Sequence, residues 1–256
     1  MRFASIGSGS EGNGTLVEHE QCRLLIDCGF SAREAVRRLI NLDIEPESIS
    51  AILVTHAHAD HIKGVAILAE KFNIPVYMTW GTSVSNGHKK REVPAELINV
   101  ISPHEMFSVQ GIQVEPVAVP HDCREPTQFV FHQGEKKLGV LSDAGAITPH
   151  MERAYQGCDA LLLECNHDLE MLRNGPYPPA LQRRVSGDFG HLNNQQAAQF
   201  LAKTHWQGLQ HVVMTHISQK NNHPELARDA LVAAINCDAD WIQAADQAEG
   251  LDWHEI

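Results

Sequence analysis

The sequence has few cysteines, and none of them form a Cys-x-x-Cys pair. The six cysteines lie at positions 22, 28, 123, 158, 165 and 237. Thiols scattered in this way, without a secretory context, argue against a disulfide framework or a zinc ribbon. We therefore expect most of them to be small buried apolar residues.

Long hydrophobic runs are also missing. No apolar stretch approaches the roughly 18–20 residues that cross a bilayer. The first seven residues, MRFASIG, contain no apolar segment typical of a signal peptide. The chain of 256 residues is nevertheless 43% hydrophobic and can bury a sizeable core, which excludes disordered and fibrous classes. The expectation is a soluble, cytoplasmic protein with no membrane partner.

Basic residues are fewer than acidic ones. The chain has 20 Lys and Arg residues and 32 Asp and Glu residues, which gives a net charge of −12. The resulting negative electrostatic field disfavours non-specific binding to nucleic acid or to anionic membranes. It does not exclude a nucleic-acid substrate, since bound divalent metals and a few local arginines can reverse the sign inside a cleft.

The chain shows no repeat, low-complexity tract or long linker, which predicts a single domain over residues 1–256. Strands are predicted at 15–17, 23–27, 51–54, 74–78, 160–164 and 211–214, and over most of 98–141. Helices are predicted after the capping residue Ser31 and over 62–72, 194–204 and 224–235. This alternation around a strand-rich middle indicates α/β layers with mixed sheets.

Histidine is abundant, with 16 residues, and the sequence concentrates it in the segment Thr55-His56-Ala57-His58-Ala59-Asp60-His61. In extended backbone His56 and His58 point the same way, because side chains alternate along a strand. Asp60 and His61 then enter a predicted helical turn and can face the same cavity. One metal ion cannot easily be coordinated by all four of these side chains, but two adjacent ions can share them. A merely polar turn would bury several imidazoles without partners, which is unfavourable.

Three further metal-capable side chains follow predicted strand ends later in the chain. His121 follows an apolar run at 117–119, Asp143 follows Val140-Leu141, and His216 follows the run at 212–215. Each alone could be a solvated loop residue. Together they are the partners that a metal site beginning at residues 56–61 requires.

The pattern His-x-His-x-Asp-His after a strand resembles the metallo-β-lactamase superfamily. Four other segments narrow the resemblance to the WalJ/YycJ group, which is similar to phosphonate-pathway phosphodiesterases and, more distantly, to tRNase Z. These segments are Gly7–Thr15, Glu164-Cys165-Asn166-His167-Asp168, Gly190-His191-Leu192-Asn193-Asn194, and Thr215–Ser218 with Asn221–Glu225. The resemblance runs from about residue 2 to residue 235.

The resemblance implies an αββα four-layer sandwich with two divalent ions, zinc first and manganese as the alternative. It assigns His56, His58 and His121 to one ion, Asp60, His61 and His216 to the second, and Asp143 to a bridging position. Members of the family are nucleases or phosphodiesterases, and the WalJ type is regarded as a DNA exonuclease. A metal-bridging hydroxide, which Asp60 helps to orient, would attack the phosphodiester.

The leaving oxygen of such a reaction needs a proton, and His191 is the first candidate for this acid. His167 is the second candidate, although either residue could instead support a ligand or cap a helix. Ser10 and Asn13, in the small-residue loop at 7–14, are candidate phosphate contacts together with Arg124. Lys89-Lys90-Arg91 and Arg183-Arg184 are short basic segments that could hold a nucleic-acid backbone or be ordinary surface.

Other functions stay open at this point. Thioester or lactam hydrolysis is disfavoured, because glyoxalase-like members carry Pro-Gly-His-Thr-x-Gly around the third ligand, and this chain has Val119-Pro120-His121-Asp122-Cys123 instead. A small cyclic phosphodiesterase and a metal-binding module without turnover are the remaining alternatives. DNA is the favoured substrate over RNA on the resemblance alone.

Overall fold

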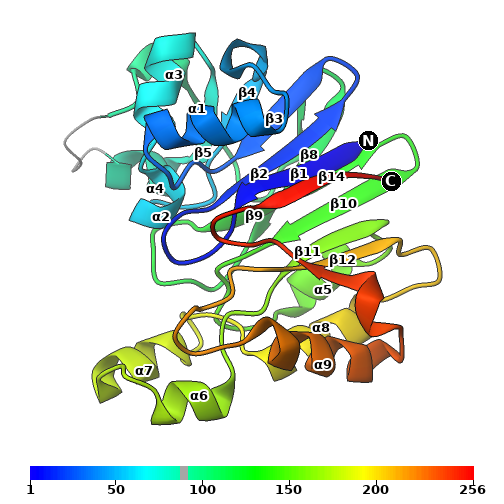
Figure 1. Cartoon of the computed structure of the whole chain (residues 1–256). Helices are drawn as coiled ribbons and strands as arrows, with labels where there is room; N and C mark the ends of the chain where they lie inside the picture. Colours follow the sequence, from blue (N-terminus) through cyan, green and yellow to red (C-terminus); the bar gives the residue numbers. More distant parts are fainter. Residues whose placement is uncertain (87–91) are drawn as a thin grey trace. The chain divides into compact units, whose positions relative to one another are not determined.

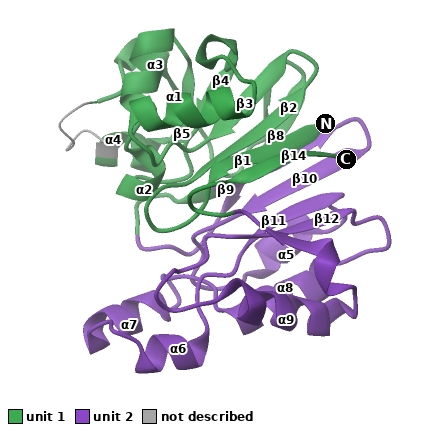
Figure 2. Cartoon of the chain, viewed as in Figure 1, with its two compact units in different colours: residues 1–116, 123–127, 246–256 green, residues 117–122, 128–245 purple. Residues whose placement is uncertain are grey.

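A computed structural model describes residues 1–86 and 92–256 (Figure 1). The predicted basic segment Lys89-Lys90-Arg91 lies outside these residues. The chain divides into two compact units, coloured separately in Figure 2. Unit 1 comprises residues 1–116, 123–127 and 246–256, and unit 2 comprises residues 117–122 and 128–245. The single domain expected over the whole chain stays a prediction.

Unit 1 is built on a mixed sheet with the strand order β14-β1-β2-β3-β4-β5-β6. Its strands are β1 (Arg2–Gly7), β2 (Gly14–His19), β3 (Cys22–Ile26), β4 (Ala51–Leu53), β5 (Val76–Thr79), β6 (Ile98–Ile101) and β14 (Leu251–Glu255). Pairing is antiparallel from β14 to β3 and parallel from β3 to β6. β7 (Phe107–Val109) and β8 (Ile112–Ala118) form an antiparallel hairpin. The short β4 is buried on both faces, as its continuous apolar run predicts.

The described residues of unit 1 contain four helices. They are α1 (Ala32–Asn41), α2 (Ala59–Ile62), α3 (Val65–Phe72) and α4 (Trp80–Asn86), with 3₁₀ turns at Pro46–Ser48 and Ala95–Leu97. Ser31 caps α1 as predicted, because its side chain accepts a hydrogen bond from the Glu34 amide. Leu39 of α1 and Leu68 of α3 are fully buried in the same core as Leu25 and Ile52 of the sheet.

The helix predicted over 62–72 ends where predicted, at Phe72, but its predicted start is wrong, because two separate helices meet there. α2 ends at Ile62 and α3 begins at Val65. The chain between them is tied to the loop after β3, since the Gly64 amide donates to Cys28 O and the Cys28 amide donates to His61 O. A Cβ at position 64 would lie only 2.5 Å from Phe30 O, so glycine permits this close approach.

Unit 2 contains the strand order β13-β12-β11-β10-β9. These strands are β9 (Thr127–Gln133), β10 (Lys136–Leu141), β11 (Ala160–Glu164), β12 (His211–Thr215) and β13 (Ile242–Ala244). β9 and β10 are antiparallel, whereas β10 to β13 are parallel. The carboxyl ends of β10, β11 and β12 therefore lie at one edge of this sheet, which brings the residues after them together.

The helices of unit 2 are α5 (Pro149–Tyr155), α6 (Leu169–Asn174), α7 (Pro179–Val185), α8 (Asn194–Thr204) and α9 (Pro224–Ile235), with a 3₁₀ turn at Ala239–Trp241. α8 and α9 have the predicted bounds, since Asn193 and Gln196 form a capping box and Pro224 occupies the first turn of α9. Phe200 of α8 and Leu231 of α9 are fully buried in a core shared with Leu163 of β11 and Met214 of β12.

Two mixed sheets flanked by helices confirm the predicted α/β class. Over residues 1–86 and 92–256, none of the helices is long and apolar enough to cross a membrane.

Candidate metal centre

The predicted histidine cluster of unit 1 follows β4 and enters α2. The ring centroids of His56 and His58 lie 4.7 Å apart, and those of His56 and His61 lie 4.1 Å apart. His56 and His61 are buried, and the Asp60 carboxylate lies 3.6 Å from His61 Nε2. The structure thus brings the four predicted side chains of this segment together at the end of one strand.

Asp27 holds this cluster in place, although sequence reasoning placed it only at a strand end. Its buried carboxylate accepts the Thr55 amide at 2.8 Å, the Thr55 hydroxyl at 2.7 Å and His61 Nδ1 at 2.8 Å. His56 Nδ1 lies 2.9 Å from the same hydroxyl. Burial raises the pKa of the Asp27 carboxyl, and the charge and hydrogen bond of His61 oppose that rise. One carboxylate therefore orients two rings through Nδ1, that of His61 directly and that of His56 through the Thr55 hydroxyl.

We predict that Asp27→Asn weakens metal binding by about 10- to 100-fold, the usual cost of losing a group that orients a ligand. The amide NH₂ of asparagine would face the His61 Nδ1 proton and favour the tautomer that protonates Nε2. Metal affinity measured by competition with a chelator tests this. Asp43→Asn is the matched control, because Asp43 is exposed and has the same left-handed backbone, with φ of 58° against 60° at Asp27. Equal affinity in the two variants would contradict the prediction.

A second cluster forms in unit 2 at the carboxyl ends of the parallel strands. Glu164 is the last residue of β11 and pairs in register with Thr215, which directly precedes His216. Asp143, Glu164, His191 and His216 each offer a ligand atom, and these atoms lie within 4.8 Å of one another. Imidazole and carboxylate donors at this spacing fit a divalent metal ion.

Glu164 is the centre of this cluster and was not among the predicted site residues. Its fully buried carboxylate lies 2.8 Å from His191 Nδ1 and 3.2 Å from His216 Nδ1, and it accepts the amides of Ala144 and Leu192. Burial alone would raise the pKa of Glu164, but the charge and hydrogen bonds of the two histidines hold it at about 2. Its position at the carboxyl end of a buried strand, close to where Asp143 and His216 follow theirs, is the signal that identifies it.

His121 belongs to unit 2, and its ring shares one feature with three other predicted histidine ligands, an oxygen partner at Nδ1. Its Nδ1 lies 2.9 Å from Gly190 O, and its Nε2 lies 3.9 Å from Asp143 Oδ1. His56, His61 and His216 likewise have Nδ1 next to a hydroxyl or carboxylate oxygen. A metal-binding histidine needs this geometry, because the bond at Nδ1 fixes the tautomer that frees Nε2. The predicted ligands therefore fit divalent metal ions.

The backbone is left-handed at three residues of these clusters. Asp27, Asp143 and His216 have φ values of 60°, 49° and 52°, each just beyond the end of a strand. A non-glycine residue in this region costs about 1–3 kcal/mol and persists where the surrounding structure imposes it. The turns redirect these side chains at the strand ends, where they join the clusters.

The two predicted acids differ in their surroundings. His191 is partly exposed, with 21% of its side chain accessible, and it is bonded to Glu164. His167 is fully buried, and neither of its ring nitrogens has a hydrogen-bond partner in the described part of the chain. Burial lowers the pKa of His167 to about 4. Of the two residues, His191 is the one that is both accessible and bonded to a carboxylate.

The residues predicted to contact phosphate lie in different settings. Ser10 is exposed, whereas the buried Asn13 side chain bonds to Gly9, to Asp60 O and lies 3.1 Å from His61 Nε2. Most amides of the loop donate within unit 1, including those of Gly9, Glu11 and Gly12. The loop therefore supports the cluster through Asn13. Arg183 and Arg184 are exposed on α7, with Arg184 paired to Asp122.

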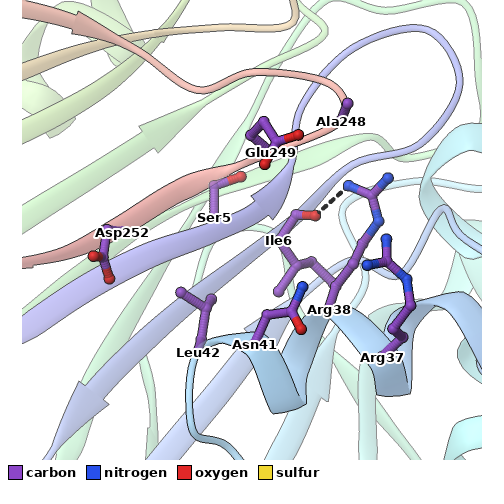
Figure 3. Close-up of a pocket in the computed structure, with 9 residues that line it drawn as sticks. All are labelled: Ser5, Ile6, Arg37, Arg38, Asn41, Leu42, Ala248, Glu249 and Asp252. Atoms are coloured by element: carbon purple, nitrogen blue, oxygen red, sulfur yellow. Dashed lines mark hydrogen bonds between the residues drawn. The ribbon is translucent and has the colours of Figure 1, made fainter.

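A separate pocket of about 320 Å³ in unit 1 contains none of the predicted site residues (Figure 3). Arg37 and Arg38 of α1 line it opposite Glu249 and Asp252. Arg38 donates to Ile6 O and Gln247 O and pairs with Glu34. Hydrogen bonds from Arg37 and Arg38 lower the pKa of Glu34 to about 2. These contacts satisfy the Arg38 cation.

Comparisons with known proteins agree with this geometry. Residues 22–217 match the family model described as a Beta-lactamase superfamily domain. Exodeoxyribonuclease YycJ of Bacillus anthracis is 35% identical over 228 residues, which are 89% of this chain and 86% of the relative. Exodeoxyribonuclease WalJ of Streptococcus pneumoniae serotype 2 is 31% identical over 235 residues, 91% and 87% of the two chains.

The fold is also shared with a solved structure. The metallo-beta-lactamase fold protein YhfI from Bacillus subtilis superimposes with a TM-score of 0.76 and 16% identity, covering 99% of both chains. The resemblance stated from the sequence is thereby confirmed, as is the fold type that it implied. With its clustered histidines and carboxylates at the strand ends, this chain belongs to the metallo-β-lactamase superfamily, in the group of YycJ and WalJ.

Proposed function

We propose that this chain is a metal-dependent exonuclease that hydrolyses phosphodiester bonds of DNA. The observation that carries the proposal is the group Asp143, Glu164, His191 and His216, in which an accessible histidine is held by a buried carboxylate beside metal donors. The names of the YycJ and WalJ relatives support DNA as the polymer and attack from a chain end.

Seven residues are proposed to hold two divalent ions, with zinc first and manganese as the alternative. They are His56, His58, Asp60, His61, His121, Asp143 and His216. Bound ions of this kind lower the pKa of water and neutralise charge on phosphoryl oxygens. Asp27, Thr55, Gly190 and Glu164 contribute by holding the rings through Nδ1.

His191 is proposed to protonate the leaving oxygen. Its Nδ1 is bonded to the Glu164 carboxylate, so Nε2 is the atom that carries the transferred proton. The Glu164 carboxylate holds the orientation of the ring through this hydrogen bond. A histidine acid near neutral pH typically contributes about 10²- to 10⁴-fold to the rate.

The test is a product ladder from end-labelled substrates. We expect the metal-loaded protein to shorten linear DNA progressively from one end and to leave circular single-stranded DNA intact. A chelator should abolish the activity, and added zinc or manganese should restore it. End-labelled RNA and bis-p-nitrophenyl phosphate form parallel arms with the same preparation.

Each other outcome of this assay has a defined meaning. Cutting of the circle would overturn the exonuclease assignment and make the protein an endonuclease. Hydrolysis of bis-p-nitrophenyl phosphate without cleavage of any polymer would favour a small-molecule phosphodiesterase. No turnover on any substrate, with intact metal binding, would favour a non-catalytic module.

A further inference from the structure

An exposed tryptophan and an exposed arginine of unit 1 stack on each other. The Arg124 guanidinium lies 4.8 Å from the centroid of the Trp80 ring. The Trp80 side chain is 52% exposed, although large apolar groups are usually buried. Within the described residues, Arg124 has no carboxylate within ion-pair distance. In a chain with a net charge of −12, an exposed arginine without an acidic partner is a specific feature.

The pair lies at the same edge of the unit 1 sheet as the histidine cluster. β4 and β5 are parallel, with Leu53 in register with Tyr77. Val54 continues this pairing, since its amide donates to Tyr77 O. Trp80 directly follows β5, His56 comes three residues after the end of β4, and neighbouring strands lie about 4.8 Å apart. Trp80 and His56 therefore both lie beyond the carboxyl ends of adjacent parallel strands, at one edge of the sheet.

The segment that carries Arg124 is fixed across this edge. The Thr127 amide donates to Thr55 O at 3.0 Å, immediately before His56. The Thr79 hydroxyl donates to Glu125 O at 2.9 Å, and the Glu125 carboxylate accepts the Gly81 amide. Three anchors thus hold residues 123–127 over the ends of both strands. Arg124 is presented on a rigid support rather than on a free loop.

We infer that Trp80 and Arg124 form a binding platform for one nucleotide of a single DNA strand. Trp80 stacks on the base, and Arg124 contacts the neighbouring phosphate. Aromatic rings bind bases of any sequence, and arginine supplies the positive charge that the backbone needs. This inference rests on the proposed function, because the strand on the platform is the substrate whose end reaches the histidine cluster.

Kinetics on a single-stranded oligonucleotide test the role of Trp80. We expect Trp80→Ala to raise KM by at least about fivefold, with kcat nearly unchanged, since base stacking on an aromatic residue is worth about 5- to 150-fold in affinity. Trp80→Phe should recover most of the loss, because a phenyl ring still stacks. Trp206→Ala is the matched control, since Trp206 is 43% exposed on unit 2.

A strand of abasic nucleotides separates stacking from a structural role. It keeps every phosphate but has no base, so Trp80→Ala should weaken its binding by less than about twofold relative to the unsubstituted protein. For Arg124→Ala, the slope of log affinity against log salt should become shallower by about 0.7, the value for one phosphate contact on a single strand. Arg153→Ala, which removes an exposed arginine from α5, should leave the slope unchanged.

Binding to a cleavage-resistant phosphorothioate strand keeps this inference separate from the proposed function. If the protein cleaves DNA but Trp80→Ala and Arg124→Ala bind and cleave normally, the platform is wrong and the exonuclease stands. If no phosphodiester is hydrolysed, the exonuclease proposal is wrong. Binding of the phosphorothioate strand by the variants is then the test of the Trp80–Arg124 platform. Equal losses for normal and abasic strands in Trp80→Ala would also overturn it.

Discussion

Replacing His58 or Asp60 by alanine is expected to abolish hydrolysis while leaving a folded protein that has lost metal. The rate should fall by more than about 10³-fold, because removal of a single charge-stabilising donor already costs about 10²- to 10³-fold. Folding should survive, since the Asp60 side chain is 26% exposed and the His58 side chain makes no capping hydrogen bond at the start of α2. Metal content by elemental analysis and thermal unfolding are measured together with activity.

The matched control for these variants is His104→Ala. His104 is an exposed histidine of unit 1 outside the cluster, so its removal should change neither metal content nor rate. Full activity of His58→Ala or Asp60→Ala in metal-buffered assays would refute the assignment of residues 56–61 as ligands. A variant that is unfolded would instead show that these side chains stabilise the fold, and the milder Asp60→Asn then tests the ligand role.

His191→Ala should lower kcat on DNA by about 10²- to 10⁴-fold and should keep both ions. The sharper readout is the leaving group. p-Nitrophenolate leaves without needing a proton, so the same variant should lose far less activity on bis-p-nitrophenyl phosphate than on DNA. His205→Ala, an exposed histidine at the end of α8, controls for the loss of a histidine from unit 2.

Two results would contradict the acid role. Equal losses on both substrates would mean that His191 does not act on the leaving oxygen. Loss of an ion from His191→Ala would make it a ligand, which its place within 4.8 Å of Asp143, Glu164 and His216 permits. His167→Ala is expected to leave this leaving-group dependence unchanged, because burial keeps that ring neutral.

Local signals in the sequence predicted much of the secondary structure. The bounds of α8 and α9 follow from Asn193 and Pro224, since capping and proline act on the first helical turn alone. β11 has its predicted bounds because a short, continuous apolar run suits a strand buried on both faces. The break at Gly64 was missed, because its cause is a loop more than 30 residues earlier.

The sequence by itself determined the family and predicted the types and order of the candidate ligands, because residues 56–61 form a compact pattern and the later candidates each follow a strand. Only the tertiary structure decided which groups hold them. Asp27 bonds Thr55 across 28 residues, and Glu164 bonds His191 across 27 and His216 across 52. It also distinguished the accessible His191 from the buried His167, and it joined Trp80 to Arg124. The physical reason is that metal-ligand residue types are readable along the chain, whereas hydrogen bonds, burial and stacking arise between strands that meet only when the sheets form.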